Sequence, residues 1–258
     1  MSKEQRAMID AMLRQPRPGG PSSVEDLRAG FRTMMATMLV PDGIRATATT
    51  LGPRPALLVE PADRPRAGTI LYFHGGSFVF GSPETALSLT GNLVARTRIR
   101  ALSLDYRLAP EHPFPAGADD ALNAYRALLD SGEDPSAIAF AGDSRGGGHA
   151  VTACPAARDA GLPVPAAIVA FSPGPDYTGT GKSTDTKAGT DPLFTRESLP
   201  HTATMYLAGQ DPDQPLLPPR PPRGPDRLPA PPAPGRHERT APRRPRQARR
   251  ARARRTST

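Results

Sequence analysis

The sequence of 258 residues contains no tryptophan and one cysteine, Cys154, and only 5% of its residues are aromatic. A single cysteine excludes an internal disulfide and is typical of a reducing compartment, so we expect a cytoplasmic protein. Residues 1–14 lack the apolar core of a signal peptide, and no run approaches the ~18 apolar residues of a membrane span. We therefore expect neither export nor membrane insertion, and we interpret Cys154 as a packed helix residue.

Acidic residues are scarce at the C-terminal end of the chain, in residues 215–258. This tail of 44 residues contains 13 arginines and 12 prolines but only two acids, Asp226 and Glu238. Because like charges repel and proline lacks an N–H donor, the composition predicts disorder. With 13 arginines and two acids, the tail carries more positive charge than the +8 of the whole chain. The basic charge therefore belongs to the tail, and residues 1–214 are slightly acidic. Reading GC-rich DNA out of frame also produces excess Arg, Pro and Ala, and we interpret the tail as a shifted reading frame.

The remaining sequence alternates apolar strand segments with helical segments, which predicts an α/β fold with a mostly parallel sheet and helices on both faces. The expected strands are 56–60, 69–73, 101–105, 137–141 and 166–171, and the later ones are apolar enough to be buried. The expected helices between them are 86–96, 118–130 and 147–160. Helical spacing in 2–14 and 24–38 predicts an N-terminal cap over residues 1–45. The core would then occupy residues 46–214, with a further cap segment near 190–208.

One short motif follows the apolar segment 137–141 directly, where residues 142–146 read GDSRG. A strand, a glycine-flanked turn and a following helix form the setting in which G-x-S-x-G presents a serine nucleophile. The N-terminus of that helix favours developing negative charge near the serine. Taken alone, the motif more often marks a glycine-rich turn that has no chemical role. Ser144 is the candidate nucleophile.

A second motif, HGGS at residues 74–77, follows the strand segment 69–73. Acyl transfer needs backbone N–H donors where the oxyanion forms, and an HGG-type loop ahead of the serine supplies them. Ser77 stands at the third position of the loop, where only its N–H group is required. We interpret His74 as a structural residue that holds the turn and not as a catalytic base.

These motifs, together with DYRLAPE at 105–111 and FPA at 114–116, resemble the hormone-sensitive-lipase branch of the α/β-hydrolases over about residues 1–214. The resemblance implies an α/β-hydrolase fold in which Ser144 is the nucleophile. It implies that the N–H groups of Gly76, Ser77 and Arg145 form the oxyanion hole, with Gly75 shaping the loop. It further implies hydrolysis of carboxylic esters with short to medium acyl chains, or of lactones, without a cofactor or metal. Residues 106–116 would brace the site.

The resemblance also places a triad acid and a histidine after further strands, and neither has a matching position in this chain. Asp191 resembles the acid motif but follows the segment 166–171 too early, and we interpret it as the start of a cap helix that includes 197–207. The five histidines have other places: His74 and His112 in the loop and brace, His149 behind the elbow, His201 in the cap helix and His237 in the tail.

From these absences we predict an esterase by family whose activity is lost or severely impaired. The last strands and the closing helix of the fold are expected to be missing, which would leave the segment 166–171 as an unpaired apolar sheet edge.

Three residues near Ser144 depart from the family pattern. Arg145 replaces the usual alanine, and we expect it to pair with Asp143 or Glu111. His149 replaces an apolar residue. Pro155 lies within the helix 147–160, where it costs about 3 kcal/mol if that helix is straight.

The alternative interpretation is a non-catalytic protein whose basic tail binds nucleic acid or acidic surfaces. Thirteen arginines attract phosphates in a salt-dependent way. However, the tail has no aromatic residue for base stacking and no folded reader motif. The expected partner is therefore a small ester or lactone, with no specific nucleic acid and no membrane, and the sequence leaves the oligomeric state open.

Overall fold

The computed structural model describes residues 2–15, 23–174, 182–187, 189–191 and 199–211. The chain divides into two units, residues 1–221 and residues 222–258, and the second lies wholly outside the described residues. The tail whose disorder the sequence predicts therefore cannot be compared with the structure, because residues 212–258 are not described.

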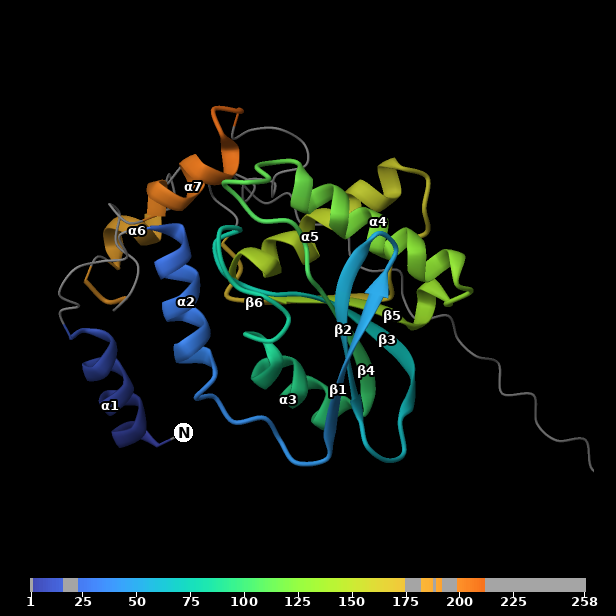
Figure 1. The fold of residues 1–258 in the computed structure, drawn as a ribbon, viewed down its shortest axis with the longest axis horizontal. Coiled ribbons are helices and arrows are strands. Elements are labelled where there is room, and N and C mark those ends of the chain that lie inside the picture. Colours follow the sequence, from blue (N-terminus) through green and yellow to red (C-terminus); the bar gives the residue numbers. More distant parts are fainter. Residues whose placement is uncertain (1, 16–22, 175–181, 188, 192–198, 212–258) are drawn as a thin grey trace, which may run out of the picture. The chain divides into compact units, whose positions relative to one another are not determined.

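The centre of the first unit is a six-stranded sheet with the order β1-β2-β4-β3-β5-β6 (Figure 1). The strands β4, β3, β5 and β6 run parallel, whereas β1 and β2 form an antiparallel hairpin whose second strand is antiparallel to β4. The strand bounds are β1 Ile44–Leu51, β2 Arg54–Pro61, β3 Arg66–Phe73, β4 Ile99–Leu104, β5 Ile138–Asp143 and β6 Ala167–Phe171.

Helices follow most of the strands, and the predicted α/β class with a mostly parallel sheet is confirmed. The helix bounds are α1 Lys3–Leu13, α2 Val24–Met35, α3 Leu87–Thr97, α4 Ala116–Asp130, α5 Ser144–Asp159, α6 Lys182–Thr186 and α7 Leu199–Leu207, with a short 3-10 turn η1 at Pro135–Ala137. Serine side chains cap the first two helices, since Ser2 accepts from Gln5 N and Ser23 from Asp26 N.

The alternating side chains of the strands divide the core between the two faces of the sheet. On one face, Ile70 and Tyr72 of β3 pack with Val94 of α3. On the other face, Leu71 and Phe73 pack with residues of α4 and α5. Figure 1 shows α3 on one side of the sheet and α4 and α5 on the other. Helices thus cover both faces of the sheet, and the loops of the candidate site follow the carboxyl ends of the parallel strands.

The structure differs from the sequence prediction chiefly at the first strand. The strand β1 was missed, although the sequence IRATATTL has the period of two that is typical of strands. The strand β6 forms the edge of the described sheet, the position expected for the segment 166–171, and its apolar residues Ile168 and Val169 are 40% and 42% exposed. Helix α5 continues through Pro155, in agreement with the expected helix 147–160. The predicted helix start at Asp191 falls largely on residues 192–198, which lie outside the described part.

Candidate active site

Ser144 lies at the junction between β5 and α5, with a left-handed φ of 51°. A non-glycine residue rarely adopts this conformation, and it is the strained backbone expected of a nucleophile elbow. The first turn of α5 approaches the end of β3 very closely. A Cβ atom added at Gly146 would lie 2.1 Å from Phe73 O and 2.3 Å from His74 O, so only glycine fits there. The elbow is therefore pressed against the HGGS loop.

The HGGS loop leaves β3 beside the elbow because β3 and β5 are adjacent parallel strands, with Phe73 paired to Gly142. Two non-glycine residues of this loop, Ser77 and Phe78, have left-handed φ values of 55° and 60°. The carbonyl of Gly76 accepts hydrogen bonds from Val79 N at 3.0 Å and Phe80 N at 2.9 Å. Among the described residues, none accepts a hydrogen bond from the N–H groups of Gly76 or Ser77.

The carboxylate of Asp143 connects the elbow to this loop. Its Oδ1 accepts hydrogen bonds from the Tyr72 hydroxyl at 2.6 Å and from Gly75 N at 2.9 Å. Burial raises the pKa of Asp143, while these two donors act in the opposite direction. Burial and the neighbouring Asp143 together raise the pKa of Tyr72, so its hydroxyl keeps its proton and remains a donor.

His74 is fully buried and supports the HGGS loop from within the core. Its Nδ1 lies 2.8 Å from Gly75 O, its ring stacks on Tyr106 at 4.2 Å, and the Tyr106 hydroxyl donates to His74 O at 2.6 Å. Burial lowers the pKa of His74 to about 4, so the ring is neutral. A neutral ring with Nδ1 next to a carbonyl carries its proton on that nitrogen, which makes His74 a donor to its own loop.

Two ion pairs hold the segment that follows β4 in place beside the site. Arg107 holds the buried carboxylate of Asp120 with Nη2–Oδ1 at 2.8 Å. Arg28 of α2 binds both carboxylate oxygens of Glu111 at 2.7 Å. Arg28 also donates to Val79 O at 2.8 Å and to Ala109 O at 3.0 Å. This one side chain therefore joins α2 both to the segment that directly follows the HGGS loop and to the brace.

The expected pairing of Arg145 with Asp143 or Glu111 is wrong. Those carboxylates are occupied by Gly75 and Tyr72 in one case and by Arg28 in the other. Arg145 is 7% exposed and donates from Nη1 to Gly174 O at 2.5 Å. Arg145 therefore contacts the segment that follows β6 through a backbone carbonyl.

No histidine in the described part of the chain hydrogen-bonds to Ser144 Oγ. His74 is turned to Gly75 O, and His112 and His201 are exposed on other segments. His237 lies outside the described residues. Asp191 is exposed, in the bend after α6.

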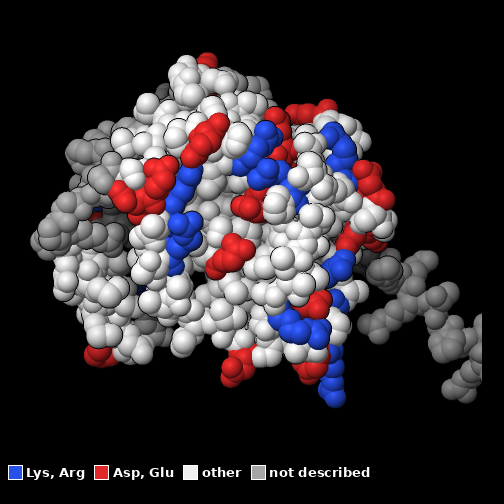
Figure 2. Space-filling model, in the orientation of Figure 1, with Lys and Arg blue, Asp and Glu red and all other residues white. Residues whose placement is uncertain are grey.

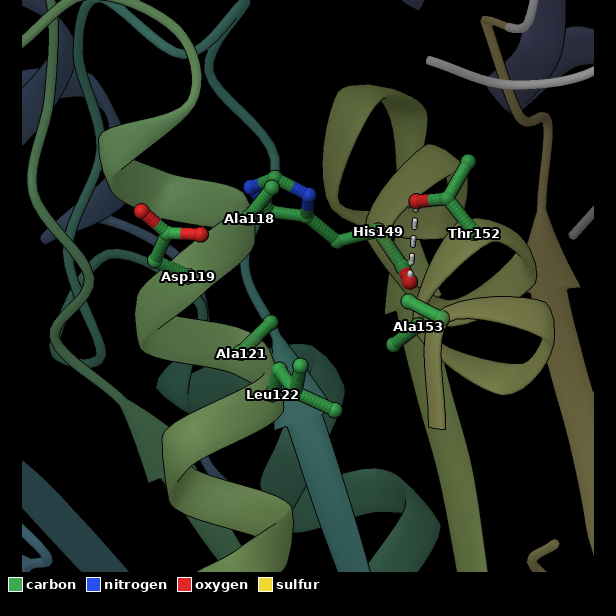
Figure 3. A pocket seen from close by; sticks show the side chains of 8 residues that line it. Ala118, Asp119, Ala121, Leu122, His149, Thr152 and Ala153 are labelled. Atoms are coloured by element: carbon green, nitrogen blue, oxygen red, sulfur yellow. Dashed lines mark hydrogen bonds between the residues drawn. The ribbon is translucent and has the colours of Figure 1, made fainter. Parts of the chain in front are cut away.

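His149 of α5 is the residue whose surroundings the sequence least foretold. It is 2% exposed and packs against Phe78 at 4.4 Å and Tyr106 at 4.9 Å. Its Nε2 is buried with no hydrogen-bond partner among the described residues. Burial lowers the pKa of His149 to about 3. Figure 3 shows the ring reaching from α5 toward α4, at a pocket of about 50 Å³ also lined by Ala118, Asp119, Leu122 and Thr152.

In the part of the chain that the structure describes, no group of three or more His, Cys, Asp or Glu side chains is arranged to hold a metal ion. Cys154 is half-buried and packs against the core, and burial raises the pKa of its thiol.

None of the helices described has the length and apolar character needed to cross a membrane. On the face in Figure 2, basic and acidic side chains are interspersed over the described surface.

Comparison with known proteins points in one direction. A family model described as alpha/beta hydrolase fold matches residues 70–233. The chain is 44% identical over 170 residues to a Streptomyces hygroscopicus protein named acetyl-hydrolase, a match that covers 66% of this chain and 56% of that protein. It is 30% identical over 210 residues to an Acinetobacter venetianus protein named esterase, covering 75% of this chain and 69% of that protein.

Solved structures give the same result. An esterase from the bacterial hormone-sensitive lipase family superimposes with a TM-score of 0.78 at 38% identity, covering 84% of this chain and 73% of that one. An esterase/lipase from an uncultured bacterium gives 0.77 at 35% identity, covering 83% and 72%. The chain thus spans little more than half the length of the Streptomyces protein and about three quarters of these two structures.

Proposed function

We propose, since the chain belongs to the α/β-hydrolase fold family, that it is built to hydrolyse carboxylic esters through an acyl-enzyme on Ser144. The predicted resemblance to the hormone-sensitive-lipase branch is confirmed by the relatives and structures described above. One observation carries the proposal. Ser144 has the left-handed backbone of an elbow and lies against a loop with two N–H groups that no described residue occupies.

Each of the site residues then has a definite role. Ser144 Oγ attacks the ester carbonyl, and the N–H groups of Gly76, Ser77 and Arg145 donate to the oxyanion that forms. Gly75 shapes the loop that carries two of these donors. The N-terminus of α5 adds a favourable dipole for the same negative charge. The substrate class is a small ester or lactone with a short acyl chain, which accords with the name acetyl-hydrolase of the Streptomyces relative. The reaction needs no cofactor, and we place it in the cytoplasm.

We further propose that this chain performs the reaction very poorly, because no histidine in the part of the chain that the structure describes lies in place as a general base for Ser144. The buried His74 and His149 point to other partners or into the core, and the exposed His112 and His201 belong to other segments. Loss of the histidine in a serine hydrolase typically costs on the order of a millionfold in turnover. The arginine-rich tail occupies the part of the sequence where the acid and histidine would follow, as a shifted reading frame would produce.

Trapping the acyl-enzyme tests the nucleophile and the missing base separately. The purified chain is incubated with p-nitrophenyl acetate, and intact-mass and peptide mass spectrometry follow acetylation of Ser144. Because the same base is needed for deacylation, we expect slow labelling to one acetyl group per chain, with little turnover. The Ser144→Ala variant is the matched control and should remain unlabelled at that peptide.

The two parts of the proposal fail in different ways. Labelling that is absent from the folded chain, or equal in Ser144→Ala, would refute the nucleophile. Rapid multiple turnover that Ser144→Ala abolishes would instead show that the chain supplies a base. Sequencing the gene across codons 210–258 tests the origin of the tail. A frame that stays open through the tail, with no alternative frame that continues the fold, would contradict a frameshift.

A further inference from the structure

We propose that Asp143 is a positioning residue that locks the nucleophile elbow to the oxyanion loop by holding the Gly75 peptide. This inference rests on the proposed function, because it concerns the geometry of the same reaction. It assigns a role to the residue next to the nucleophile that its place in the sequence does not reveal. The carboxylate does not touch the substrate in this proposal but acts through the loop.

The first argument is the direction in which the carboxylate points. Asp143 is the N-cap residue of α5, a position where aspartate normally accepts a hydrogen bond from its own helix. Here its side chain makes no such cap. It reaches across to β3 and accepts from the Tyr72 hydroxyl and from Gly75 N, which are 71 and 68 residues away in sequence. A good local interaction is replaced by a contact between the two catalytic segments.

The second argument is how closely the two segments meet. A Cβ atom added at Gly75 would lie 2.2 Å from Asp143 Oδ2 and 3.2 Å from Asp143 O. Gly75 is therefore confined against the carboxylate as well as bonded to it. The next two peptides carry the N–H groups of Gly76 and Ser77, so the orientation of Gly75 sets where those donors point.

The third argument is the support behind the carboxylate. The Tyr72 hydroxyl donates to the same Oδ1 atom that accepts from Gly75 N, and Tyr72 is fully buried in β3. Tyr72 thus fixes the oxygen that fixes the loop. A misplacement of about 1 Å in such a site can cost about a hundredfold in rate, so a rigid link of this kind matters to catalysis.

The experiment measures the single-turnover acetylation rate of Ser144 as a function of p-nitrophenyl acetate concentration. In Asp143→Ala we expect the limiting rate constant to fall about 100-fold, with a much smaller change in the half-saturating ester concentration. Asp143→Asn keeps an oxygen acceptor for Gly75 N, so it should retain a rate within about 10-fold of the original. Tyr72→Phe keeps the Gly75 bond and removes only the support, so it should lie between the two.

The outcomes separate this inference from the proposed function. If the unaltered chain is not acetylated at Ser144, the proposed function fails. If it is acetylated and Asp143→Ala reacts at the same limiting rate, the positioning role is refuted. A purely structural role predicts that the folded fraction of each variant reacts normally, so rates are corrected for the folded fraction by circular dichroism. Should Asp143→Ala not fold, an Asp143→Asn rate as low as that of Ser144→Ala would overturn the inference, and retained activity would support it.

Discussion

Replacing His149 with leucine should make the protein more stable, because this histidine is buried without a partner for Nε2. The ring is 2% exposed and is surrounded by Phe78, Tyr106 and the small side chains of the pocket. Leaving a buried polar atom unsatisfied costs about 1–3 kcal/mol, and an apolar side chain of similar size removes that cost. We therefore expect His149→Leu to raise the free energy of unfolding at pH 7 by about 1–3 kcal/mol.

The pH dependence of stability gives an independent measure of the same effect. The pKa of His149 is about 3 in the folded state and about 6.5 in the unfolded state. Between these values the unfolded chain binds a proton that the folded chain excludes, so His149 lowers stability as pH falls from 6.5 toward 3. From pH 7 to pH 5 this costs about 2 kcal/mol, which His149→Leu should abolish. His74, whose pKa is lowered to about 4, retains its own contribution in the variant.

Urea unfolding followed by far-ultraviolet circular dichroism at pH 7 and pH 5 tests both values, because the chain has no tryptophan to report by fluorescence. The matched control is His112→Leu, the same substitution at an exposed histidine, which should change stability by less than about 0.5 kcal/mol. If His149→Leu unfolds more easily at pH 7, or keeps the full pH dependence, then the imidazole has a partner and the reasoning is wrong.

Two further substitutions test the packing around the site. Pro155→Ala restores an N–H donor to the carbonyl of Val151 inside α5, so we expect up to about 3 kcal/mol of added stability by urea unfolding, and no gain would show that the helix already accommodates proline. Arg28→Leu leaves two backbone carbonyls without their donor and should raise hydrogen exchange in α2 by loosening its attachment, at about 2 kcal/mol. The control Glu111→Gln keeps the two hydrogen bonds from Arg28 to the carbonyls and should have little effect, since the Glu111 carboxylate is exposed. Equal effects of the two variants would show that the carbonyl bonds do not hold α2 in place.

Much of the architecture could be predicted from local patterns. The segment 69–73 lies within β3, the segments 101–105 and 137–141 overlap β4 and β5 to within one residue, and the expected helices correspond to α3, α4 and α5. These elements are encoded by consecutive residues whose period or apolar run is visible in the sequence. β1 was missed because threonine and alanine alternate there with little apolar contrast. The apolar composition of β6 by itself suggested a buried strand, but its place at the edge of the described sheet leaves it exposed, because burial depends on what covers a strand.

The motifs alone predicted Ser144 and the loop of Gly75, Gly76 and Ser77 as the candidate site, because nucleophile elbow and oxyanion loop are short, contiguous turns with fixed glycine positions. Only the tertiary structure decided which distant groups meet them. The register of β3 against β5 brings Gly75 to Asp143, packing brings Arg145 to the carbonyl of Gly174, and the approach of α4 to α5 encloses the ring of His149. Such contacts join residues far apart in the chain, and their partners follow from the geometry of the whole sheet, which no short stretch of sequence contains.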